Sequence, residues 1–135
     1  MIPEFLAAVI DTLLPGDDVL PSGTAAGVAL APGTHAPVLQ AVRTEAGGMD
    51  AFAQAPEAAR VAVLQAVERA HPETFRALLV AVLSDYYEAA LVLAALGWRS
   101  DPPQPWGHAL PIMDSPTSEH LERVRQRDRL WRGRC

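Results

Sequence analysis

The chain has 135 residues, the length of one domain, and half of them are hydrophobic while a fifth are charged, a composition that excludes wholesale disorder. Its net charge of -5 at pH 7 argues against general attraction to nucleic acid or to an anionic membrane surface. The single cysteine is the last residue, Cys135, which excludes a disulfide within the chain and any multi-cysteine metal or haem motif.

The first third of the chain predicts amphipathic helices joined by breakers. Residues 3–14 have a proline suited to a first helical turn and apolar residues at helical spacing. The small-sided stretch 24–31 predicts a further short helix with Thr24 as its N-cap. Ala36–Ala46 follows, with a proline in its first turn and two glycines after its end.

The middle of the chain carries the strongest periodicity. Residues 56–70 repeat apolar side chains at three- and four-residue steps opposite a charged face. Pro72 opens the next helix, whose apolar repeat runs to Tyr86, and residues 89–96 predict another helix that ends at a glycine. This apolar region contains two carboxylates within 84–88, which would be costly in lipid. It therefore predicts buried helices and no membrane insertion.

The composition changes after Trp98. Prolines recur from position 102 to position 116, which excludes a regular helix and favours an extended strap. Ser118 then predicts the N-cap of a final helix, from Glu119 to about Arg132. Because no stretch alternates like a strand, we expect an all-α, compact single-domain bundle: a helical core over 1–98, a proline-rich extended strap over 99–118 and a C-terminal helix over 119–132.

No pattern points to a catalytic, cofactor-binding or metal residue in this chain. The four histidines have no histidine or carboxylate four residues on, as a metal-binding helix face would. Asp11, Asp17 and Asp18 suggest a cation loop, but their spacing is not that of an EF-hand, and a helix-ending turn explains the last two. No nucleophile elbow, phosphate loop or dinucleotide fingerprint occurs.

The C-terminal arginines favour a protein partner over nucleic acid. Six arginines follow His120, but carboxylates are interleaved with them, and Glu119 and Arg123 have the spacing of a helical ion pair. Upstream, the adjacent tyrosines 86 and 87 point about 100° apart on a helix, so one can pack inward while the other meets a neighbour. We expect a wet protein interface to include Tyr86, Tyr87, Trp98, Pro103, Pro105, Trp106, Arg123, Arg127 and Trp131.

Several short motifs occur in an order found in one protein family. In the first part of the chain they are Ile10-Asp11-Thr12-Leu13-Leu14-Pro15, Asp17-Asp18, Pro21 and Gly27-Val28. In the second part they are Phe75, Tyr86-Tyr87, Val92-Leu93-Ala94-Ala95-Leu96-Gly97-Trp98, and Pro103-Gln104-Pro105 with Gly107. From residue 10 to about 110 the chain thereby resembles the gluconate 2-dehydrogenase subunit 3 family, through the order of its motifs and not through a catalytic signature.

The resemblance implies a small helical subunit of a larger enzyme. Its partner would be a large flavoprotein dehydrogenase of the glucose-methanol-choline type that oxidises a sugar, sugar acid or alcohol, with FAD and the catalytic groups in that partner. The small subunit would help the partner mature, stay stable or reach the periplasm. The N-terminus lacks a twin-arginine signal, so we expect the cytoplasm, or the periplasm if an exported partner carries the chain.

Two other interpretations are open. The chain is a stand-alone helical enzyme if folding brings a histidine to Asp11, Asp17 or Asp85. Alternatively, it is a homo-oligomeric interaction protein without a flavoprotein partner.

Overall fold

The computed structural model describes residues 3–31, 33–99, 101, 107 and 114–127. Within them it contains seven α-helices and no strand, so the all-α prediction is confirmed. The chain divides into two compact units, Met1–Ser100 and Asp101–Cys135.

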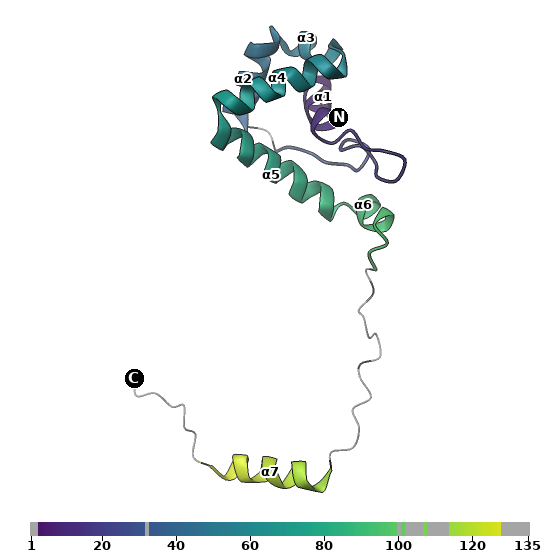
Figure 1. Ribbon diagram of the computed structural model, residues 1–135, viewed down its shortest axis with the longest axis vertical. Helices are drawn as coiled ribbons and strands as arrows, with labels where there is room; N and C mark the ends of the chain where they lie inside the picture. The colour runs from purple at the N-terminus through teal and green to yellow at the C-terminus, as the bar shows by residue number, and fades with distance from the viewer. Residues whose placement is uncertain (1–2, 32, 100, 102–106, 108–113, 128–135) are drawn as a thin grey trace, which may run out of the picture. The chain divides into compact units, whose positions relative to one another are not determined.

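The first unit holds the first six helices (Figure 1). In chain order they are α1 (Glu4–Leu13), α2 (Ala36–Ala46), α3 (Met49–Gln54), α4 (Glu57–Ala70), α5 (Pro72–Glu88) and α6 (Ala90–Ala95). The helices α1 to α4 gather at one end, and α5 extends from them to α6 at the other (Figure 1). The helices predicted at 3–14, 36–46 and 56–70 and the one opened by Pro72 are all present.

One hydrophobic core joins these helices. Phe5 of α1 and Phe52 of α3 meet edge to face, with ring centroids 5.7 Å apart, and Phe52 is fully buried. Burying such a side chain contributes about 1.5–3 kcal/mol. Every buried residue in the described part of the chain is apolar apart from the hydroxyl of Tyr86 and the small Gly23. The half-buried Arg60 nevertheless has its Nε atom buried without a hydrogen-bond partner among the described residues.

Helix α5 connects this core to α6. It begins with Pro72 in the first turn, directly after His71, the one residue between α4 and α5. Its buried side chains recur at three- and four-residue steps, as in any helix with one covered face: Phe75, Leu78, Val82 and Tyr86. The helix stops where Ala89 takes an extended conformation, with ψ 131°.

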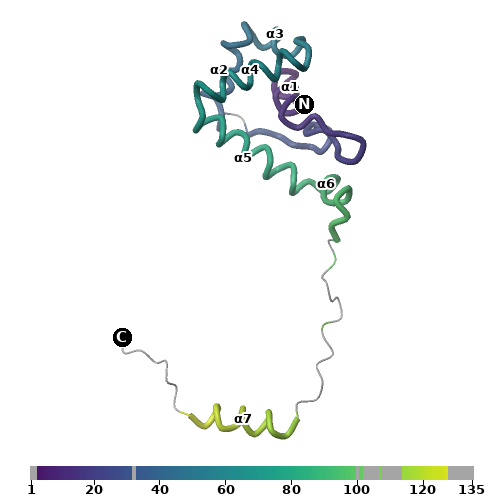
Figure 2. The backbone as a smooth tube through the Cα atoms, viewed as in Figure 1, coloured from purple at the N-terminus to yellow at the C-terminus, as the bar shows by residue number. Residues whose placement is uncertain are grey.

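The long segment between α1 and α2 is fastened to both α1 and α5. Asp11 of α1 accepts hydrogen bonds from the backbone N–H of Thr24, at 2.8 Å, and from its hydroxyl, at 2.6 Å. The hydroxyl of Tyr86 donates to the carbonyl oxygen of Pro21 at 2.7 Å, and Figure 2 shows the segment running beside α5. The helix predicted over 24–31 is therefore wrong: successive turns occupy 23–27, and Thr24 is bound to Asp11 instead of capping a helix.

Two further predictions are corrected by the structure. Helix α3 was not expected: it has six residues and one buried side chain, Phe52, too short a segment to show periodicity. The C-terminal helix α7 spans Ser115–Gln126, with Asp114 and not Ser118 as its N-cap. The predicted strap therefore ends earlier than residue 118, and the helix ends before Arg127, which is extended.

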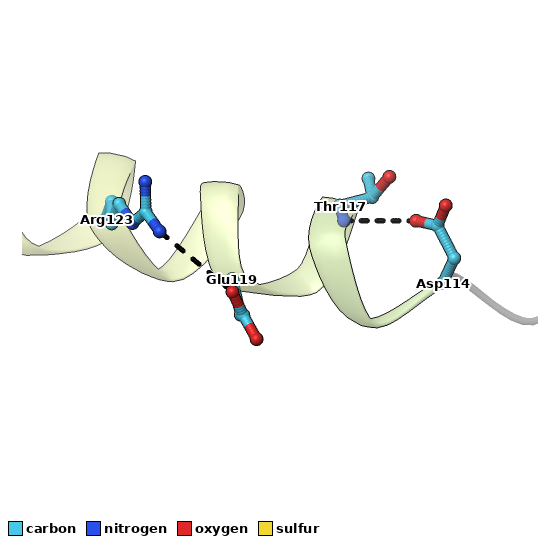
Figure 3. Close-up of polar contacts among 4 residues, drawn as sticks. All are labelled: Asp114, Thr117, Glu119 and Arg123. Carbon is cyan, nitrogen blue, oxygen red and sulfur yellow. Dashed lines mark hydrogen bonds and ion pairs between the residues drawn. The ribbon is translucent and has the colours of Figure 1, made fainter.

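The second unit contributes α7. Asp114 accepts a hydrogen bond from the backbone N–H of Thr117 at 3.0 Å, and Arg123 lies 4.0 Å from Glu119 (Figure 3). No residue of α7 is buried. Among the described residues, no helix has the length and apolar character needed to cross a membrane.

Candidate protein-interaction site

The two adjacent tyrosines take opposite roles. Tyr86 is 4% exposed, and its hydroxyl is bound to Pro21, whereas Tyr87 is 52% exposed. Their rings meet edge to face at 5.4 Å. Tyr86 was predicted as an interface residue, but its burial assigns it to the core, where it holds the end of α5 against the preceding loop. Tyr87 is the tyrosine available to a partner.

The environment of Tyr86 keeps its hydroxyl protonated. Burial raises the pKa of Tyr86 above its ordinary value of 10.0, and the nearby Tyr87 and Asp17 add smaller electrostatic contributions in the same direction. At neutral pH the side chain is therefore a neutral hydrogen-bond donor. This donor role suits the short contact with the Pro21 carbonyl.

Large apolar side chains are exposed where α5 passes into α6. We call Tyr87, Leu91, Leu96 and Trp98 the α6 surface; the last three are 59%, 55% and 70% exposed. Helix α6 itself buries only Val92. The prediction that residues 89–96 form a buried helix is thus wrong for most of its side chains. Exposed apolar groups gathered along a short stretch of chain are typical of protein interaction sites.

The backbone of the α6 surface is ordered by its own hydrogen bonds. The N–H of Ala89 donates to Tyr86 at the end of α5 (3.1 Å), and the N–H of Leu93 donates to Ala89 (3.0 Å). The N–H of Trp98 then donates to the carbonyl of Leu93 at 2.8 Å, a bond that closes the C-terminal end of α6. Trp98 is therefore held on a defined turn. Leu91 and Leu96 were missed as candidates; the signal for them is that 89–98 contains no polar side chain.

Helix α7 carries a second, smaller apolar stripe. Leu121 and Val124, 42% and 59% exposed, lie three residues apart and so share a face. The predicted contact Arg123 is paired with Glu119 through exposed side chains, and such pairs contribute little stability. Arg127 follows the helix directly. The remaining predicted contacts, Pro103, Pro105, Trp106 and Trp131, lie outside the described residues.

The aspartates of the enzyme interpretation serve the fold. Asp11 holds Thr24, and Asp17 accepts hydrogen bonds from the backbone N–H groups of Val19 and Leu20, both at 2.7 Å. The bond from Leu20, followed by that from Val19, lowers the pKa of Asp17. Asp85 is exposed on α5. A helix-ending turn thus accounts for Asp17.

Two open grooves lie on the first unit, and neither is lined by these aspartates. One, of about 240 Å³, lies between α1, α4 and α5 and is mostly apolar, with Leu13, Leu64 and Phe75 in its walls. The other, of about 360 Å³, lies between α2 and α4 and includes Glu45 and His71. In the described part of the chain, no three histidine, cysteine or carboxylate side chains are grouped to hold a metal ion.

Comparison with known proteins finds no family model, no curated protein and no solved structure that matches this chain.

Proposed function

We propose that this chain is a non-catalytic accessory subunit that binds a flavin-dependent dehydrogenase and stabilises it or helps it mature. The observation that carries the proposal is the α6 surface, on which Tyr87, Leu91, Leu96 and Trp98 are all more than half exposed. The resemblance to the gluconate 2-dehydrogenase subunit 3 family supports the kind of partner: a large flavoprotein that oxidises a sugar, sugar acid or alcohol.

The energetics of the α6 surface support a binding role. Apolar surface removed from water contributes about 25 cal/mol per Å², and aromatic side chains are the commonest anchors of protein interfaces. Trp98 and Tyr87 are therefore the strongest candidates for such anchors. They lie on a backbone that is already folded, so a partner would not have to order it.

Helix α7 supports the same role in a different way. An isolated helix of about twelve residues is marginal in water, and α7 has twelve residues of which none is buried. A partner that covered Leu121 and Val124 would stabilise it. We include Pro103, Pro105, Trp106 and Trp131 in the proposed interface on the grounds of their residue types alone.

FAD and the catalytic groups belong to the partner in this proposal, and this chain contributes none. Supporting this division, Asp11 and Asp17 are engaged in hydrogen bonds that hold the loop between α1 and α2. The complex works in the cytoplasm, or in the periplasm if the partner carries the export signal.

Co-purification from the native host tests the proposal. A tagged chain should recover a much larger protein in a fixed ratio, with the absorbance spectrum of a bound flavin. Recovery of the chain alone would contradict the proposal. If it is recovered alone with a mass that is a multiple of its own, the homo-oligomeric alternative holds instead.

A further inference from the structure

We propose that the α6 surface docks into an apolar groove whose rim carries lysine and arginine side chains, on the surface of the partner protein. This inference deepens the proposed function and rests on it, because it states which part of the chain makes the contact and what chemistry receives it. Three observations carry it: the apolar character of α6, its fixed geometry and the charge around it.

Helix α6 has no polar face of its own. Its six residues are Ala-Leu-Val-Leu-Ala-Ala, and no polar or charged side chain occurs from Ala89 to Trp98. A helix that is apolar all round is normally covered all round, yet α6 buries only Val92 within this unit. A groove on another protein would cover the rest, as when a helix enters an apolar groove with a few side chains as anchors. Leu91 and Trp98 are the side chains best exposed to act as those anchors.

The docking element is preorganised. Tyr86 is locked to the loop by its 2.7 Å bond to Pro21, so the last turn of α5 has a fixed place. From there, backbone hydrogen bonds continue through Ala89 and Leu93 to Trp98. Side chains held in this way lose less conformational entropy on binding than side chains on a loose tail, and preorganisation increases affinity by lowering that cost.

The charge around the α6 surface favours a basic rim. Asp85 and Glu88 are exposed beside Tyr87 in the sequence, and the exposed Arg99 beside Trp98 is the single basic side chain in the described stretch 85–99, so this stretch is net acidic. Residues 1–100 contain eleven acidic residues and five arginines. An anionic membrane or a second copy of this unit would present charge of the same sign, whereas a basic rim would attract it.

The experiment compares variants of the full chain with matched controls. Leu91→Ser/Trp98→Ser removes the apolar anchors, and Met49→Ser, on α3 at the other end of the unit (Figure 1), changes a residue of similar character and 47% exposure. Asp85→Asn/Glu88→Gln removes the acidic flank, and Asp50→Asn/Glu57→Gln removes two exposed carboxylates elsewhere. Because all these side chains are exposed, each variant should retain the wild-type far-ultraviolet circular dichroism.

The probe is the flavoprotein that co-purifies with the wild-type chain, separated and titrated with each variant at low and high salt. We expect the apolar double variant to bind at least ~30-fold more weakly, the size of a lost interface anchor, and Met49→Ser to bind as wild type. Neutralising the acidic flank should weaken binding ~3- to 10-fold at low salt, with the difference shrinking as salt screens the charges. The distant neutral pair should leave both values unchanged.

Other outcomes separate this inference from the proposed function. If a flavoprotein is recovered and binds the apolar double variant as tightly as wild type, the inference is wrong and the proposed function stands. If no flavoprotein is recovered, both are wrong. A dimer of the free chain that dissociates on Leu91→Ser would show that a second copy covers α6. Sedimentation with phosphatidylglycerol vesicles that is abolished by the same change would show that a lipid surface does so. Either result overturns the basic-rimmed groove.

Discussion

Replacement of Tyr86 by phenylalanine tests how the end of α5 is held. The ring is buried, so Tyr86→Phe keeps the packing and removes only the hydroxyl that donates to the Pro21 carbonyl at 2.7 Å. A neutral hydrogen bond of this kind contributes about 0.5–1.5 kcal/mol net, and a stranded carbonyl adds to the loss. Because Pro21 is only half-buried, water can replace part of the bond. We expect the free energy of unfolding to fall by about 1 kcal/mol and the midpoint by about 4–8 °C for a unit of this size.

The assay is urea and thermal unfolding of the full chain, followed by far-ultraviolet circular dichroism. Tyr87→Phe is the matched control, since it removes the hydroxyl of a half-exposed tyrosine on the same turn, and it should change stability by less than about 0.5 kcal/mol. Equal stabilities for wild type and Tyr86→Phe would refute the assignment of Tyr86 as an anchor. A larger loss in Tyr87→Phe than in Tyr86→Phe would reverse the roles of the two residues.

The same pair of variants has a pH signature. The pKa of Tyr86 is raised in the folded chain, chiefly by burial, relative to its ordinary value of 10.0. The stabilising contribution of the neutral hydroxyl is therefore fully present below pH 10.0 and is lost as pH rises through the raised value, because the unfolded chain releases its proton first. Wild type should lose stability over this alkaline range more steeply than Tyr86→Phe. Parallel curves would contradict a raised pKa at this position.

Three further predictions concern the loop and the second unit. Asp11→Ala strands the N–H and hydroxyl of its partner in the loop and should lower the urea stability by about 1–3 kcal/mol; an unchanged midpoint would contradict its anchoring role. Gly16→Ala should lower the thermal midpoint more than Gly47→Ala. Both glycines have a positive φ, but a Cβ at Gly16 would lie 2.5 Å from the Ser22 nitrogen, whereas one at Gly47 meets nothing within 4 Å. Equal losses would show that the loop around Gly16 shifts to make room for the Cβ. Asp114→Ala should reduce the helical carbon chemical shifts of α7, because it removes the N-cap. Acid should have the same effect on the wild-type chain: hydrogen bonds from the Thr117 hydroxyl and N–H lower the pKa of Asp114 below 3.8. The stabilising contribution of the cap is therefore present above pH 3.8 and is lost as pH falls through the lowered pKa.

The predictable part of the fold is the part with a local signal. Ala36–Ala46 was predicted at both ends because a proline lies in its first turn and a glycine follows its last residue. Helix α5 was predicted because its apolar repeat runs over three turns. The missed features depend on residues distant in the sequence. The hydroxyl of Thr24 donates to Asp11, thirteen residues away, and no residue near Thr24 in the sequence predicts that hydrogen bond.

The C-terminal helix shows how a local signal can favour the wrong residue. Ser118 and Asp114 are both good N-cap types, and both are followed by a plausible helix. Asp114 wins because Pro116 lies in the first turn, where a proline's missing N–H costs nothing. With the cap at Asp114, the N–H of Ser118 donates within the helix to the Asp114 carbonyl at 3.0 Å. The competing prediction failed by treating Pro116 as a breaker.

The tyrosine pair and α6 mark the limit for the candidate site. The apolar repeat of α5 places Tyr86 on the covered face and Tyr87 about 100° away from it, but nothing in the sequence predicts the hydrogen bond from Tyr86 to the Pro21 carbonyl. Helix α6 shows the opposite case: an apolar run predicts burial, whereas within this unit Val92 is the only residue of the helix that is fully buried. An apolar sequence pattern indicates that a surface is covered, but it does not indicate whether the covering residues belong to the same chain. Leu91 and Trp98 are exposed within this unit, and the interface proposed for α6 assigns their cover to another molecule.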